Sequence, residues 1–320
     1  ISEKYIEGQA QAVRSVNSII IDTNWNIGKH IVEYEQGGNP KAKYGEKLLE
    51  NLSHDLTLLH GRGFSRSNLN YMRLFYMRYP ICEKLSHKLS WSHYCELVKI
   101  DDDLERSFYY QQNILENWSV PELRRQKNSA LFMRLGISRN KKEILKLAKK
   151  GQIIEKPADI VKDTYVFEFM KIPEPYIVSE NELETRLIDN LQKFLLELGK
   201  GFTFVGRQYR IMINNTTYRV DLVFYHRILR CFVLIDLKIN EVKHNDIGQM
   251  NMYMGYFVKE ENCEGDNPPI GIILSKEKDE LLVEYATYGM NSQLFVAKYQ
   301  LYLQNKEELR RLIISQLEIE

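Results

Sequence analysis

Cysteine is scarce in this sequence and long apolar segments are absent. The 320-residue chain has four cysteines, Cys82, Cys95, Cys231 and Cys263, and none of them forms a C-x-x-C pair. This disfavours a disulfide framework or a thiolate zinc site and fits buried thiols in a reducing compartment. No apolar run approaches the roughly 20 residues that span a bilayer, and no secretory pattern is visible at the start. We therefore expect a cytoplasmic protein without a membrane-embedded part.

Motifs of several common enzyme classes are also missing. No P-loop, G-x-G-x-x-G, G-x-S-x-G or H-E-x-x-H string occurs, so the sequence gives no support for a phosphate-binding loop, a serine hydrolase or a helical zinc protease. The composition is nonetheless that of a folded protein, with 44% hydrophobic and 27% charged residues. The length is ample for two domains.

The net charge of +1 conceals an asymmetry between the two halves. Residues 1–150 carry 24 Lys and Arg against 17 Asp and Glu, and residues 151–320 carry 20 against 26. The densest basic stretch is 121–150, with ten Lys and Arg. A polyanionic partner for the first half is one interpretation, and a solvated helix face explains the charge equally well.

The first half reads almost entirely as helix. Leucines recur at helical spacing over 44–60, Gly61 and Gly63 interrupt the pattern, and a second helix is expected from Ser65 to Tyr79, before Pro80. This outline is that of a helix-turn-helix unit, although packed helices joined by glycine are common in any helical domain. The side chains that could contact nucleic acid there are Arg62, Arg66, Ser67, Asn68, Asn70 and Arg73.

Further helices are expected at about 91–99, 102–117 and 120–135. The last begins with a capping box at Ser119 and Glu122. Four of its basic residues could follow phosphates: Arg124, Arg125, Lys127 and Arg134. Prolines then appear and the helical period fades around 151–178, so we predict a domain boundary there and divide the chain into 1–155 and 156–320.

The second half has a mixed pattern. A capping box at Ser179 and Glu182 starts a helix that we expect to end at Gly199. Segments rich in Val, Ile, Phe and Tyr predict strands, whereas two later segments have the helical period. The expected strands are 202–213, 217–225, 229–239, 270–275 and 293–303, and the expected helices are 244–258 and 306–317. This order predicts an α/β sandwich with a central mixed sheet.

Two of these apolar strands carry ionisable residues that packing does not require. Asp221 lies in one strand, and Asp236 and Lys238 share one face of the next. If the strands form an antiparallel hairpin, Asp221 approaches Asp236, and two adjacent carboxylates repel unless a cation lies between them. Oxygen ligands favour Mg²⁺ or Mn²⁺ over zinc. Such a site suits phosphodiester hydrolysis, with Lys238 orienting the attacking water, whereas a lone D-x-K would more simply be a salt bridge.

These residues carry a family resemblance. YRVDLVFYHRILRCFVLIDLKI (218–239) resembles the PD-(D/E)XK nuclease superfamily and, followed by GQMNMYMGYF (248–257), more narrowly resembles the YhcG family. The segments GRGFSRSNLNYMRLFY, LSWSHYCELVKID and WSVPELRRQ extend this likeness over nearly the whole chain. The resemblance implies an all-helical, winged-helix-like N-terminal domain and a C-terminal restriction-endonuclease-like domain, with a mixed sheet flanked by helices.

The resemblance also implies roles for individual residues. Asp221, Asp236 and Lys238 match the motif, although Val220 replaces the proline of the superfamily name. Glu184 matches the acidic residue often contributed by the preceding helix, and the metal set implied is Glu184, Asp221, Asp236 and the Leu237 carbonyl. Gln249 and Tyr253, which share a helix face, are implied to close the active site. An exposed glutamate and an ordinary tyrosine anchor are the simpler alternatives.

Together these observations predict a Mg²⁺- or Mn²⁺-dependent nuclease that cleaves duplex or branched DNA in repair, recombination or defence. The alternatives are a non-catalytic DNA-binding or assembly protein on a nuclease fold, and a nuclease acting on RNA. A homodimer is expected by analogy only. Weaker candidates for phosphate contact or proton transfer lie near the motif: Arg207, Arg210, Arg219, Lys243, His226 and His244.

Overall fold

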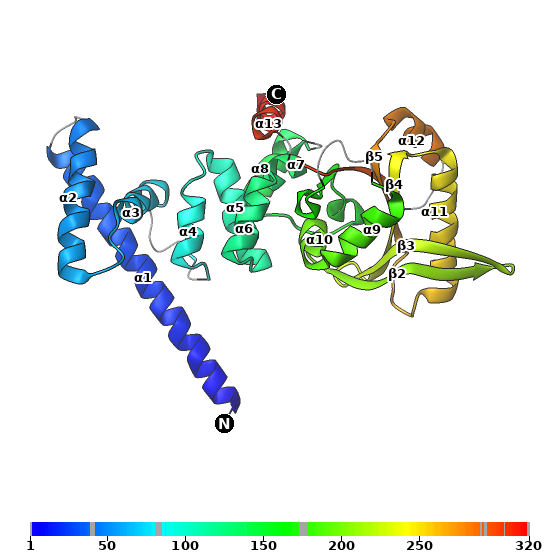
Figure 1. The fold of residues 1–320 in the computed structure, drawn as a ribbon, viewed down its shortest axis with the longest axis horizontal. Helices are drawn as coiled ribbons and strands as arrows, with labels where there is room; N and C mark the ends of the chain where they lie inside the picture. Colours follow the sequence, from blue (N-terminus) through cyan, green and yellow to red (C-terminus); the bar gives the residue numbers. More distant parts are fainter. Residues whose placement is uncertain are drawn as a thin grey trace. The chain divides into compact units, whose positions relative to one another are not determined.

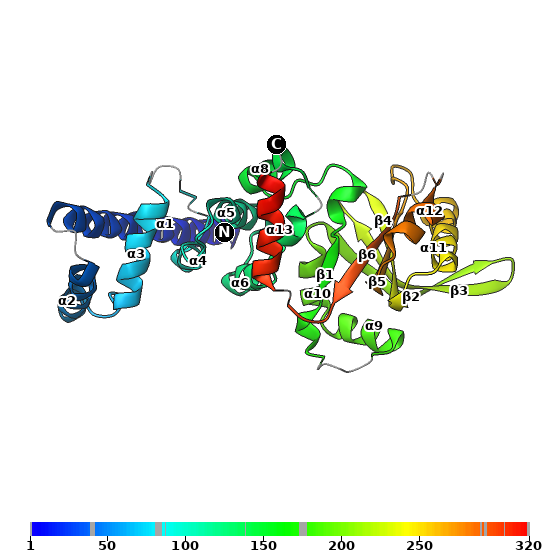
Figure 2. The ribbon, with the colours of Figure 1, turned by 90° about the horizontal axis from the view of Figure 1, so that it is seen from above.

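The computed structural model describes residues 2–38, 42–80, 85–86, 88–137, 139–172, 178–288, 290, 293–303 and 305–318. The chain divides into two compact units, Ile1–Arg125 and Gln126–Glu320 (Figures 1 and 2). No helix in the described ranges has the length and apolar character needed to cross a membrane.

The first unit is helical. Its helices are α1 (Ser2–Gly38), α2 (Ala42–His60), α3 (Arg66–Arg78), α4 (Trp91–Leu97), α5 (Asp103–Glu116) and the start of α6 (Val120–Asn128). The Ser65 side chain caps α3 by accepting a hydrogen bond from the Asn68 N–H at 3.3 Å. The predicted helix, glycine turn and helix are therefore confirmed. The described part of this unit contains no strand, so the wing implied by the resemblance is not found there.

Helix α1 crosses α3 at a glycine. A methyl group at Gly28 would lie 2.0 Å from the Met72 carbonyl oxygen, which is far inside van der Waals contact. Ile31, Leu49, Leu69 and Met72 form a buried cluster beside this crossing. The close approach of the two backbones thus depends on the absence of a side chain at position 28.

The second unit contains a six-stranded mixed sheet in its described residues, in the order β1-β6-β5-β4-β3-β2. The antiparallel part is β2, β3 and β4, and the parallel part continues through β5, β6 and β1. The strands are β1 (Thr164–Val166), β2 (Phe202–Ile213), β3 (Thr216–His226), β4 (Cys231–Glu241), β5 (Ile270–Glu277) and β6 (Leu294–Gln300). The five predicted strands are confirmed, and β1 was missed because three buried residues show no period.

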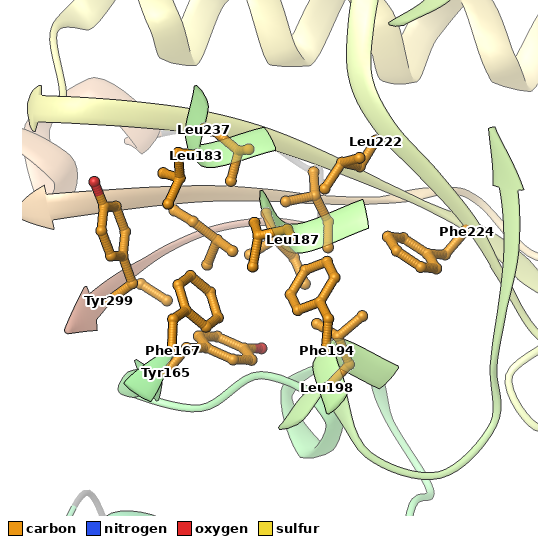
Figure 3. Close-up of a cluster of buried hydrophobic side chains, with 14 of the residues drawn as sticks. Tyr165, Phe167, Leu183, Leu187, Phe194, Leu198, Leu222, Phe224, Leu237 and Tyr299 are labelled. Carbon is orange, nitrogen blue, oxygen red and sulfur yellow. The ribbon is translucent and has the colours of Figure 1, made fainter. Parts of the chain in front are cut away.

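Helices pack on both faces of this sheet. The helices of this unit that follow α6 are α7 (Leu131–Gly136), α8 (Lys141–Lys150), α9 (Glu180–Asp189), α10 (Leu191–Leu198), α11 (His244–Tyr256), α12 (Glu280–Thr287) and α13 (Lys306–Glu318), with short turns at Pro157–Ile160, Glu168–Met170 and Phe257–Glu261. The apolar stripe of α9 and α10 packs against one face of the sheet (Figure 3). Helix α11 covers the other face through residues that include Ile247, Met250 and Tyr253.

Two predicted helices are each broken in the structure. The helix expected at 120–135 is interrupted at Ala130, which has a φ of 51°, and gives α6 and α7. The helix expected to end at Gly199 is interrupted at Asn190, which ends α9 and precedes α10. Both breaks lie between segments of correct helical period, so the period alone did not reveal them.

The structure divides the chain before the predicted boundary at 155/156. Arg134, expected to contact phosphates, is 1% exposed and pairs with the buried Glu197 of α10 at 2.6 Å. Lys162 lies 3.8 Å from the same carboxylate. The expectation that Arg134 contacts phosphates was wrong, because its side chain is buried in an ion pair with Glu197. This pair connects α7 with α10, and residues 126–155 belong to the second unit.

Candidate active site

The two acidic strand residues meet where the sheet opens. Pairing between β3 and β4 ends at Leu222 opposite Ile235, so Asp221 and Asp236 occupy the next opposed positions. Their carboxyl groups are close enough for the charge of Asp221 to raise the pKa of Asp236. Asp221 Oδ2 also accepts the Leu237 N–H at 2.8 Å, which satisfies a donor that the ladder has released. The predicted approach of the two carboxylates is therefore present.

Lys238 completes this group. Its Nζ lies 2.7 Å from Asp236 Oδ2 and 4.0 Å from Asp246 Oδ1. Burial disfavours the ammonium form of Lys238, but the carboxylate of Asp236 outweighs this effect and raises the lysine pKa. The lysine is therefore held as a cation beside the acidic pair.

The acidic pair is costly in the absence of a metal cation. Asp236 is 5% exposed, and burial followed by repulsion from Asp221 raises its pKa, although Lys238 offsets part of the effect. The fold thus gathers negative charge in a place where water screens it poorly. A divalent cation would relieve that cost, and oxygen donors suit Mg²⁺ or Mn²⁺.

Glu184 approaches the pair from helix α9. It is 3% exposed, and burial raises its pKa. Gln208 Nε2 donates to Asp221 Oδ1 at 3.1 Å and also to Glu184 Oε2. Arg207 Nε lies 3.3 Å from Glu184 Oε1. Glu184 is therefore not the exposed helix residue of the simpler alternative, and it reaches the acidic pair through an intervening amide.

Sequence reasoning missed Gln208 altogether. A glutamine within an expected strand resembles a solvent-facing residue, and no spacing singles it out. As the side chains stand, the described residues contain no cluster of three His, Cys, Asp or Glu arranged to hold a metal. The acidic pair still fits the donor chemistry, and the Gln208 amide links Glu184 to Asp221.

Gln249 and Tyr253 lie on α11, as the spacing predicted, and their side chains are hydrogen bonded to each other. Tyr253 is 1% exposed, and burial raises its pKa, with smaller contributions from Asp236 and Asp221. Those contributions show that the phenol lies near the acidic pair. Gln249 is exposed and can be reached from solvent.

The other candidates near the motif have different surroundings. His226 is buried, with its ring bonded to the Lys200 carbonyl and the Leu229 N–H at 2.9 and 3.1 Å, so it supports a turn and was wrongly considered for proton transfer. Arg210 lies 3.4 Å from Thr217 Oγ1 on the exposed hairpin. Arg219, Lys243 and His244 are exposed.

Some of the residues of the helical region that were predicted to contact nucleic acid form ion pairs or hydrogen bonds within the protein. Arg73 pairs with Glu35 at 2.7 Å, and Arg66 lies 3.5 Å from Glu50. Arg124 pairs with Glu96 at 2.8 Å. Asn68 is bonded within the fold to the Gly63 carbonyl and Trp91. Arg62 and Ser67 are exposed, and Asn70, Arg125 and Lys127 are half-buried.

Comparisons with known proteins identify the family of this chain. Residues 158–313 match the model of the YhcG PDDEXK nuclease domain, and residues 1–134 match the DUF1016 N-terminal domain. The chain is 35% identical over 333 aligned positions to "Putative nuclease YhcG" of Escherichia coli (strain K12), covering 94% of this chain and 88% of that protein.

A repair endonuclease from Pyrococcus abyssi is a much weaker structural match. The TM-score is 0.28 at 17% identity, over 41% of this chain and 50% of the endonuclease. The match to the E. coli protein and the two domain models carry the assignment. The chain belongs to the YhcG family, whose C-terminal part is a PDDEXK nuclease domain with a restriction-endonuclease-like fold.

Proposed function

We propose that this chain is a Mg²⁺- or Mn²⁺-dependent nuclease that hydrolyses DNA phosphodiester bonds. The observation that carries the proposal is the position of Asp221 opposite Asp236 on neighbouring strands, with the Lys238 ammonium 2.7 Å from the second carboxylate. Packing alone gives no reason to gather two repelling carboxylates and a lysine at the opening between two buried strands.

Asp221 and Asp236 would hold the ion, with the Leu237 carbonyl as a further oxygen donor and Glu184, which Gln208 links to Asp221, as a third carboxylate. When bound, a divalent ion polarises a phosphoryl oxygen and lowers the pKa of water. Lys238 has the charge and position to orient the attacking water and to stabilise negative charge that develops on the phosphate.

Gln249 and Tyr253 would support this site from α11. The bond between their side chains holds the Gln249 amide beside the Tyr253 hydroxyl, from where it would donate to the water or to the substrate backbone. Arg207, 48% exposed beside Glu184, is a candidate for a neighbouring DNA phosphate. In the first unit, Arg62, Arg66, Asn68, Arg73, Arg124, Arg125 and Lys127 are the candidates for DNA contact.

The activity is tested with purified full-length protein, Mg²⁺ or Mn²⁺, and matched linear, nicked and branched DNA. The wild type should cut, and Asp236→Ala and Lys238→Ala should not. Lys276→Ala, which removes an exposed lysine of the same sheet, is the matched control and should cut normally. Equal cutting by all variants would indicate a contaminant and overturn the proposal.

The same assay decides between the alternatives. Preferential cleavage of matched RNA would replace DNA as the substrate. Salt-sensitive DNA binding without cleavage under either metal would favour a non-catalytic binding protein.

A further inference from the structure

Gln208 has an unusual backbone for its place in the sheet. It lies within β2, between the paired residues Arg207 and Tyr209, yet its φ is 47°. This left-handed conformation is unfavourable for an L residue, and glycine, asparagine and aspartate adopt it most readily. Such strain persists only where the surrounding structure requires it, and it is frequent at functional sites.

One requirement is architectural. Leu222 packs in the core under α9 and α10, whereas Val220, two residues away, packs in the core under α11. Side chains two apart normally share a face, so the alternation of the hairpin reverses at Asp221 and at Gln208 opposite it. On β2 the reversal occurs at the positive φ of Gln208, which glycine would provide without strain.

The Gln208 side chain forms hydrogen bonds that the strand reversal does not require. An amide nitrogen carries two hydrogens, and here Nε2 donates to Asp221 and to Glu184. Repulsion from Asp221 contributes to the raised pKa of Glu184, after burial, and the hydrogen bond from Gln208 opposes that rise. Glycine could not make either bond, so the architectural need does not account for glutamine.

We propose that Gln208 is a positioning residue for the metal site, which fixes Asp221 and brings Glu184 of α9 within reach of the ion. This inference rests on the proposed function and adds a residue to it. In other proteins, loss of a residue that orients a metal ligand weakens metal affinity roughly 10–100-fold. We expect an effect of that order at Gln208. Gln208 touches neither the substrate nor the reacting atoms in this role.

The test compares two variants that lack the amide but differ in backbone freedom. Gln208→Gly keeps the positive φ without strain, and Gln208→Met keeps the length of the side chain without a donor. Arg230→Gly is the matched control, because Arg230 also has a φ of 47° but lies in the exposed turn between β3 and β4. Mn²⁺ affinity is measured by calorimetry on full-length protein, and the fold by circular dichroism.

Both Gln208 variants should bind Mn²⁺ about 10-fold or more weakly than the wild type, and Arg230→Gly should bind normally. Half-maximal cleavage should need correspondingly more Mn²⁺, with kcat recovering at saturation, which a general loss of structure would not allow. Should Gln208→Gly fail to fold, Gln208→Met decides alone.

The inference would be overturned, and the proposed function left intact, if Gln208→Gly bound Mn²⁺ as tightly as the wild type. If Gln208→Gly does not fold, the same result for Gln208→Met would overturn it. If only Gln208→Met were weakened, the role would belong to the backbone and the inference would fail. Absence of Mn²⁺ binding in the wild type would instead overturn the proposed metal site, and this inference with it.

Discussion

Asp236→Asn should stabilise the metal-free protein at alkaline pH. The carboxyl is 5% exposed, and its pKa is raised by burial and then by the charge of Asp221. Each unit by which a folded-state pKa exceeds the unfolded value costs about 1.4 kcal/mol once the group is charged. Since the amide keeps the shape without the charge, we expect a gain of about 1–3 kcal/mol in unfolding free energy at pH 8.

The pH dependence has a definite sign. Because the folded pKa of Asp236 lies above its unfolded value, the wild type loses stability as pH rises from the unfolded pKa to the folded one. Asparagine does not titrate, so the advantage of the variant should shrink toward zero as pH falls through that window. Urea unfolding in EDTA at a series of pH values between 4 and 8.5 measures it.

Asp266→Asn is the matched control. The pKa of Asp266 is lowered by hydrogen bonds from the Tyr225 hydroxyl and the Cys263 N–H, so the same substitution there should destabilise. A metal-free Asp236→Asn protein that is less stable than the wild type at pH 8 would refute the reasoning, because the acidic pair would then be net favourable without an ion.

Three further outcomes follow from the same structure. Mg²⁺ should raise the wild-type Tm more at pH 8 than at pH 5.5, since protons compete for the Asp236 carboxylate, and calorimetry measures this; equal shifts would contradict it. Glu197→Gln should cost about 3–5 kcal/mol in urea unfolding, because Arg134 and Lys162 would remain buried without their carboxylate; a loss below 1 kcal/mol would contradict it. Gly28→Ala should cost about 1–3 kcal/mol by thermal unfolding, from the clash with the Met72 carbonyl; an unchanged Tm would refute the close crossing.

The buried ion pair of Glu197 lies close to the border between the two matched family regions. The matched N-terminal region ends at residue 134 and the nuclease region starts at 158. Arg134, at the end of the first match, is bonded to Glu197 within the second. Residues after Arg125 therefore fold with the sheet, although part of that segment matches the N-terminal family model.

The sequence alone determined the elements whose signals are local. The strand of Asp221 and the D-x-K strand show continuous apolar character broken by charges, and the strand period of two by itself places Asp236 and Lys238 on one face. Ser65 and Ser179 marked helix starts, because their hydroxyl groups cap the following N–H donors. Such signals depend on neighbours along the chain.

Only the tertiary structure decided what depends on residues distant in sequence. The opening of the ladder at Leu222, which lets Asp221 bond the Leu237 N–H, follows from where β3 separates from β4. Arg134 looked like a phosphate contact until Glu197 was found against it. Gln208 carries no local signal, because its role arises from a reversal of strand alternation and from two carboxylates that reach it from a helix and a neighbouring strand.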